Sequence, residues 1–381
     1  MRPLLALCVV VTLSLFACGG DATRGDQILF VASGDDDALD VFLTQADGRW
    51  IKNLTDHPAS DFGATWSPDG RTIAFFSTRD EDVPSAAFAD LYVMDADGSN
   101  VERVAEIKTV SRSGLSVASW NSDGHRLLYA EGYDLRITDV DGVVYDPNVE
   151  SRFTHAWSPD GEQIVFFGVG DQTRDDVAHW SIHPYTLEAQ RLFSPIRERE
   201  PCGEDPRLLR TDEDRMKLAA RLALSRPNGS INYDIQFSPA TGDALYWLEV
   251  CRDGVINYEL ALRDRDFDDE RMLTEDPEDE FIARWSPDGT RIAYVREPVN
   301  GPPSIWAMNA DGTDKTLLAE DAGQFSWSPD GSRIAFVGTK EPGSYTLDDF
   351  AIFTVNADGT DRQLIVDGLG LIWTLEWSPV R

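Results

Sequence analysis

The feature that most constrains the fold is a short motif that recurs along the chain. An aromatic residue is followed by Ser-Pro-Asp-Gly or a close variant, and then by a run of β-forming apolar residues. The aromatic residues of the seven copies are Trp66, Trp120, Trp157, Phe237, Trp285, Trp327 and Trp377. Proline presets φ for the first corner of a turn, and glycine accepts the positive φ that closes it. Each copy therefore predicts a tight turn between two strands.

The segments between these turns predict four strands per repeat. An apolar run such as 72–77 (TIAFFS) follows the turn, and a second run such as 90–98 (DLYVMDADG) ends in Asp-Gly. Asp-Gly between two β-runs is a strong hairpin signal. A more polar run such as 101–106 (VERVAE) completes the unit. The pattern predicts one small antiparallel sheet per repeat.

The period and the two ends of the repeat region predict the architecture. The aromatic residues are mostly 37 to 54 residues apart, with one gap of 80, and a four-stranded repeat of this period is typical of a propeller. The motif at Trp377 stops where its apolar run should begin, whereas 27–33 is such a run without its aromatic residue. We expect these two segments to pair. The predicted fold is all-β: a seven-bladed β-propeller over 28–381, closed by its N- and C-terminal strands.

The repeat resembles the Pro-Asp propeller repeats of the TolB family. The resemblance is carried by the W-S-P-D-G turn, the I-A-F run and the N/D-A-D-G-T hairpin, and it covers nearly everything from residue 28 to 381. It implies an envelope protein that acts as a protein- or peptide-binding scaffold. Similar repeats also occur in propellers attached to prolyl-oligopeptidase-type hydrolases. No G-x-S-x-G motif is present in this sequence.

The N-terminus predicts export and lipid anchoring. One arginine precedes an apolar run from Leu4 to Ala17, which has the length of a secretory signal segment. The residues that end at Cys18 resemble a bacterial lipobox, which implies cleavage after residue 17, acylation of Cys18 and sorting to the outer membrane. We expect 1–17 to be a lipoprotein signal peptide and 18–27 a flexible tether.

The net charge of the chain limits the classes of molecule that it is expected to bind. The formal net charge of −33 repels nucleic acid and anionic lipid surfaces. It suits a basic patch on a protein or peptide, or a divalent cation such as calcium. We expect a monomer that reaches the membrane through its lipid anchor only. The charge is also explained by solubility alone.

Acidic residues gather in the predicted loops of one face. In a four-stranded blade the Ser-Pro-Asp-Gly turns and the Asp-Gly hairpins share one end of the ring, and the longer loops share the other. The acidic loop residues assigned to this second face are Asp35, Asp36, Asp37, Asp80, Glu81, Asp82, Asp175, Asp176, Asp279 and Glu280. They predict an acidic binding face, although ordinary solvated loop charges would give the same pattern.

The longest gap between repeats holds an insertion at 195–230. A capping pattern at Thr211 and an apolar stripe that ends before Pro227 predict a short helix, which either covers the mouth of the ring or packs on a blade. Cys202 in the insertion and Cys251 map to the same face of adjacent blades. We predict a disulfide between them in an oxidising compartment.

Signals for catalysis are weak. His179 and His183 lie four residues apart on one side of a predicted strand, but two histidines are not a metal site without a third ligand. The Asp-x-Asp-Gly segments lack the later ligands of a calcium loop and are explained as hairpins. We therefore expect no cofactor and favour a binding scaffold over an enzyme. The alternative is a glycan lyase or hydrolase with a site at the channel mouth.

Overall fold

The structure is a computed structural model, and its regular elements are β-strands. It describes residues 26–33, 38–80, 89–107, 118–169, 177–186, 188–193, 235–252, 255–298, 301–344, 349–368 and 370–379. Within these ranges the regular elements are 28 β-strands, and none is an α-helix. The helix expected at 195–230 lies outside these ranges, so it stays a prediction.

Five sheets have four strands each, and all neighbouring strands within them are antiparallel. Sheet by sheet, the strands are β28 (Ile372–Trp377), β1 (Gln27–Ser33), β2 (Leu39–Gln45) and β3 (Ile51–Asn53); β4 (Asp61–Trp66), β5 (Thr72–Ser77), β6 (Asp90–Asp95) and β7 (Glu102–Ala105); β16 (Gln236–Phe237), β17 (Ala244–Arg252), β18 (Val255–Arg263) and β19 (Glu270–Met272); β20 (Asp279–Trp285), β21 (Arg291–Glu297), β22 (Ser304–Asn309) and β23 (Thr316–Glu320); and β24 (Ala322–Trp327), β25 (Arg333–Thr339), β26 (Phe350–Asn356) and β27 (Gln363–Asp367).

The sixth sheet has eight strands in two halves. Its strands are β8 (Ser119–Trp120), β9 (Arg126–Glu131), β10 (Asp134–Asp139), β11 (Val144–Tyr145), β12 (Glu150–Trp157), β13 (Ile164–Val169), β14 (Val177–Ile182) and β15 (Ala189–Phe193). The halves β8–β11 and β12–β15 are joined through the single pair of Asp134 with Glu150. We refer to each four-stranded sheet, and to each half of this one, as a blade named by its strands.

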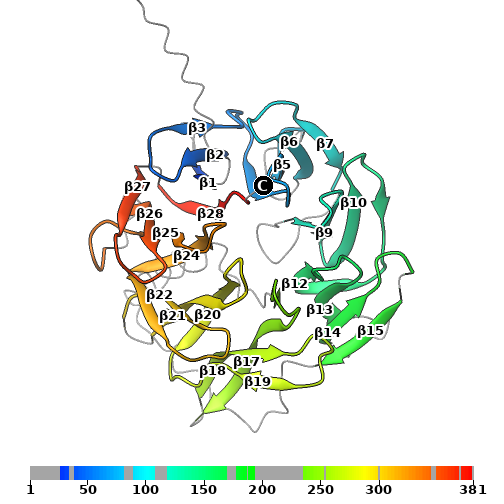
Figure 1. The fold of residues 1–381 in the computed structure, drawn as a ribbon. Coiled ribbons are helices and arrows are strands. Elements are labelled where there is room, and N and C mark those ends of the chain that lie inside the picture. Colours follow the sequence, from blue (N-terminus) through cyan, green and yellow to red (C-terminus); the bar gives the residue numbers. More distant parts are fainter. Residues whose placement is uncertain are drawn as a thin grey trace, which may run out of the picture.

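The blades follow one another around a ring, with their first strands innermost (Figure 1). The blade that contains β1 takes its innermost strand from the far end of the sequence, because β28 pairs with β1. Ile28 lies opposite Trp377, and the backbone N–H of Ser378 donates a hydrogen bond of 2.8 Å to the carbonyl of Gln27. The structure is therefore an all-β propeller in which segments from both ends of the sequence share one sheet.

The recurring turns have the chemistry that the motif predicts. The hydroxyl of Ser67 donates to the carboxylate of Asp69 at 2.8 Å and accepts from the N–H of Thr72 at 3.0 Å. Gly70 closes the turn at a φ of 61°, which strains any residue with a Cβ. The same bonds recur in the turns that contain Ser158, Ser286 and Ser328. Each inner strand is thus tied locally to the strand that follows it.

The aromatic residues that precede these turns fill the contacts between blades. Trp66 and Trp377, for example, are each 4% exposed. The indole N–H of Trp120 donates to the carbonyl of Thr65 in the preceding blade at 3.4 Å. The indoles of Trp157 and Trp327 make the equivalent bond to the blades before them. We call the aromatic residues that precede the turns the anchors. Trp120, Trp157 and Trp327 therefore combine burial of a large ring with a directional bond between blades.

Candidate functional site

Most of the acidic residues assigned to the binding face lie outside the described residues. These are Asp35, Asp36, Asp37, Glu81, Asp82, Asp175 and Asp176, and Cys18 and Cys202 lie outside them as well. The backbone of Cys251 is on β17. The lipid anchor, the disulfide and the acidic face as a whole remain predictions.

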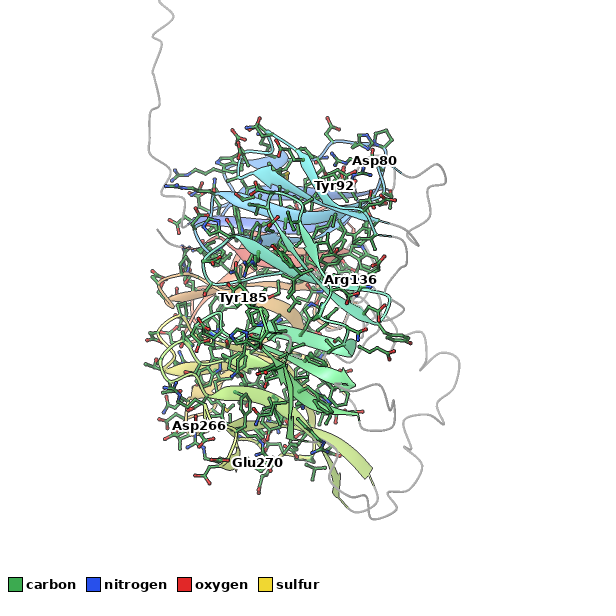
Figure 2. The ribbon with its side chains drawn as sticks, turned by 90° about the vertical axis from the view of Figure 1, so that its right-hand side faces the viewer. Asp80, Tyr92, Arg136, Tyr185, Asp266 and Glu270 are labelled. Carbon is green, nitrogen blue, oxygen red and sulfur yellow. The ribbon has the colours of Figure 1, made fainter. Side chains whose placement is uncertain are left out.

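Asp80 is exposed at the end of the turn that follows β5. Figure 2 shows it toward one face of the ring, with Asp266 toward the opposite face. The hydroxyl of Tyr92 donates to Asp80, and a guanidinium nitrogen of Arg103 lies 3.6 Å from it. Arg103 also pairs with the buried Asp90 at 3.0 Å. Burial and the hydrogen bond to Asp80 both raise the pKa of Tyr92, so this phenol stays a donor. Asp80 is therefore an exposed carboxylate held in a fixed orientation.

Asp279 and Glu280 are buried at the start of the inner strand β20. They are 6% and 0% exposed, so they are not part of a solvent-exposed surface. Asp279 accepts a hydrogen bond from the N–H of Tyr258 at 3.1 Å, and Glu280 accepts one from the hydroxyl of Thr274 at 3.1 Å. Burial and the nearby carboxyl of Glu259 raise the pKa of Glu280 to about 9. At neutral pH this pair of glutamates retains a proton.

The equivalent junction between two other blades shows how unusual this pair is. There Asp40 accepts from the hydroxyl of Thr55 at 3.1 Å and from the amide of Asn53 at 2.7 Å. Asp61 on β4 pairs with Arg79 at 3.1 Å. Thr55 and Thr274 have the same role, since each accepts from a backbone N–H of the preceding blade.

Strand register relates the two junctions residue by residue. Phe62 and Phe281 follow the two acids and face equivalent partners across the bulged inner strands, so Glu280 takes the place of Asp61. Arg296 lies opposite Glu280 in the register, but its guanidinium bonds Glu278. A recurring spacing of six residues between threonine and acid is the sequence signal for this site, and the predictions from sequence did not use it.

Glu376 on β28 and Arg284 on β20 form a second pair of charged residues, and both lie on innermost strands. Glu376 on β28 accepts a hydrogen bond from the N–H of Trp66 at 3.1 Å. Ser326 has the same role in the preceding blade, where its hydroxyl accepts from the N–H of Trp377 at 2.9 Å. Glu376 and Ser326 each directly precede an anchor tryptophan. In both cases the side chain at this position accepts a hydrogen bond from a backbone N–H of the next blade.

Glu376 is the acidic member of this inner-strand position. Burial raises its pKa to about 7, against the opposing effects of the Trp66 N–H, the Thr65 hydroxyl and the cation of Arg284. Arg284 occupies the same position on β20, two blades before β28. A half-buried carboxyl that titrates near neutral pH can donate or accept a proton, and this pair was not among the residues singled out from the sequence.

His179 on β14 and His183 in the turn after it differ in how far they are exposed to solvent. His179 is 1% exposed beside the rings of Phe167 and Tyr246, and burial lowers its pKa to about 3. His183 is partly exposed, 3.7 Å from a carboxylate oxygen of Glu162. Across the described ranges no three His, Cys, Asp or Glu side chains are arranged to hold a metal ion. The same ranges hold no helix with the length and apolarity needed to cross a membrane.

Comparison with solved structures shows the fold. TolB from Acinetobacter baumannii superposes with a TM-score of 0.54 at 13% identity, over 94% of this chain and 67% of that one. The β-propeller domain of the Trilobed protease from Pyrococcus furiosus gives 0.57 at 13%, over 91% and 93%. Oligogalacturonate lyase from Vibrio parahaemolyticus gives 0.57 at 12%, over 90% and 84%. At these identities the likeness shows the propeller fold alone.

Comparison of sequences adds the type of repeat. The uncharacterized peptidase YuxL from Bacillus subtilis is 38% identical over 63 residues, which are 16% of this chain and 8% of the peptidase. The match thus spans less than a tenth of that relative. Residues 22–177 match the family model of the TolB beta propeller domain. The fold is therefore that of a β-propeller, and residues 22–177 are similar to the TolB type of propeller repeat.

Proposed function

We propose that this chain is an envelope-anchored scaffold that binds a protein or peptide through the acidic loop face of a TolB-like propeller. The observation that carries the proposal is the charge of −33 on a propeller with an exposed, fixed carboxylate at Asp80. Propellers present loops on a rigid ring, and carboxylates on such loops attract a basic partner.

The proposal includes a ring of seven blades. Five four-stranded sheets and the two halves of the eight-stranded sheet support this number, and the pairing of β28 with β1 supports closure. A closed ring leaves no long inner edge, so strand addition at the inner edge is disfavoured and the end faces become the surfaces for partners.

The proposal also includes export and anchoring through Cys18, which would hold the propeller at the envelope. The similarity to TolB supports this location. Burial of Asp279 and Glu280 restricts the proposed face to Asp80 and to the acids at 35–37, 81–82 and 175–176.

The test is capture from envelope extracts by the acylated protein. The variant combines Asp80→Asn, Glu81→Gln and Asp82→Asn. The control combines Asp266→Asn, Asp268→Asn and Asp269→Asn, which removes the same charge from exposed carboxylates of the turn between β18 and β19. Figure 2 shows Asp266 of this turn toward the opposite face. We expect the loop-face variant to lose captured proteins and the control to keep them, with capture weakening as salt rises. Equal capture by both would overturn the acidic face.

A further inference from the structure

Exposed apolar side chains gather on the face opposite the acidic loops. Among the described residues, four of the large exposed ones belong to blades β8–β11 and β12–β15: Val143, which precedes β11, Val144 and Tyr145 on β11, and Tyr185 in the turn after β14. Tyr185 is the most exposed of these, at 58%, and Figure 2 shows it away from the face that carries Asp80. We call Arg126, Val144, Tyr145, His183 and Tyr185 the tyrosine patch.

The two tyrosines are held by a shared cation. The guanidinium of Arg126 lies 4.6 Å from the ring centroid of Tyr185 and 5.9 Å from that of Tyr145. On the other side, the rings of His183 and Tyr185 are 5.6 Å apart. The patch therefore spans two blades and is ordered before any partner arrives. Preordered aromatic rings lose little conformational entropy on binding, which favours them as anchor points.

Carboxylates surround the patch. The turn at 158–161 lies against the turn at 121–124, since a Cβ on Gly161 would be 3.1 Å from the hydroxyl of Ser122. Exposed acids on these turns and the adjoining ones are Asp123, Asp141, Asp160, Glu162 and Glu188. Hydrogen bonds from the Ser158 hydroxyl and the Glu162 N–H lower the pKa of Asp160, so it stays ionised. Aromatic and Arg side chains at the centre, with a charged rim around them, are the usual layout of a protein-binding hot spot.

We propose that the tyrosine patch docks a peptide segment of a protein partner, with an aromatic or aliphatic anchor flanked by Lys or Arg. Charge complementarity selects this occupant, because the rim carries five carboxylates and a basic segment gains from them where an uncharged glycan does not. The inference rests on the proposed scaffold function, and it adds a second docking surface on the opposite face.

The experiment measures binding of a fluorescent synthetic peptide that carries two tryptophans between lysines. Versions with glutamate for lysine and with serine for tryptophan test the two halves of the recognition. The protein variant is Tyr145→Ser with Tyr185→Ser. The control is Tyr133→Ser, because Tyr133 is 44% exposed and Tyr145 is 42% exposed, while Tyr133 lies at the other end of its blade, between β9 and β10.

We expect the double variant to weaken binding by about tenfold or more, and the control to leave it unchanged. Both altered peptides should bind more weakly to the unmodified protein, and binding should fall as salt rises. Thermal unfolding of each variant confirms that the exposed substitutions leave the fold intact.

Equal binding by the double variant and the control would overturn the docking surface. The docking surface would also be overturned if the tyrosine substitutions mainly reduced self-association of the protein. The same holds if they mainly reduced binding of an uncharged oligosaccharide. If the peptide loses affinity only for the variant at Asp80, Glu81 and Asp82, the tyrosine patch fails and the acidic loop face stands. Failure of the intact protein to capture any envelope protein would instead count against the scaffold itself.

Discussion

The carboxylate of Glu376 accepts a hydrogen bond of 3.1 Å from the backbone N–H of Trp66, which lies 310 residues earlier in the chain. The bond joins the strand near the C-terminus to the first strand of the next blade. Burial raises the pKa of this carboxyl to about 7, while the Trp66 N–H favours its ionised form. The hydrogen bond between these two blades therefore depends on whether Glu376 is ionised.

Replacement of Glu376 should change how stability depends on pH. The ordinary pKa of 4.5 rises to about 7 in the folded protein, so between these values the folded state holds a proton that the unfolded state has lost. The free energy of unfolding must then fall as pH rises through this window. Glu376→Gln should flatten the fall between pH 4.5 and 7, measured by urea unfolding at several pH values. A slope identical to that of the parent would contradict this.

Glu280 should act in the same direction over a wider window. Its pKa is about 9 when folded, and the groups around it are Glu259, Thr274, Asp276, Tyr294 and Arg296. Glu280→Gln resembles the protonated acid, so we expect little change in stability at pH 5 and a gain relative to the parent near pH 9. The check is the urea midpoint at both pH values, with Asp266→Asn as an exposed control. Destabilisation that grows with pH would refute the shared proton.

Two turn glycines form a matched pair. Gly289 and Gly331 share a φ of 69°, but a Cβ on Gly289 would lie 2.6 Å from the Cβ of Ala240, whereas the nearest atom to one on Gly331 is 3.7 Å away. Gly331→Ala should cost about 1–2 kcal/mol of unfolding free energy from backbone strain. Gly289→Ala should cost about 1–3 kcal/mol more because of the clash. Denaturant unfolding of both variants measures the difference, and equal losses would show that the turn can shift.

Cys18 should carry the lipid. With Cys18→Ala we expect loss of palmitate incorporation and movement of the protein from the membrane fraction to the soluble fraction of the producing cell, because the substitution removes the thiol that would be acylated. Cys8→Ala is the control and should keep the label. Retention of the label in the Cys18 variant would rule out this site of acylation.

Cys202 and Cys251 should be joined in the exported protein. Alkylation before reduction should leave both thiols unmodified, whereas alkylation after reduction should modify both, as measured by mass spectrometry. Cys202→Ser should lower the melting temperature, since a bridge of this span restricts the unfolded chain. Free thiols in the unreduced exported protein would contradict the pairing.

The local features of this fold follow from the order of residues. Ser67-Pro68-Asp69-Gly70 forms its own turn, and the run after it becomes β5 at the expected residues, because both depend on bonds among neighbours. The positions of the strands therefore indicate which side chains point to the same face of a sheet. They do not indicate whether a neighbouring blade covers a polar residue at a strand end.

Tertiary packing decided the candidate sites for that reason. Asp279 and Glu280 have the composition of a solvated loop, yet both are buried against the preceding blade, where the nearby carboxyl of Glu259 raises the pKa of Glu280. The bond between Glu376 and Trp66 and the stacking of Arg126 on Tyr185 also join different blades. The sequence by itself determined the turns, the strands and the anchors, whereas burial and the neighbours of each charge depend on how the blades pack around the ring.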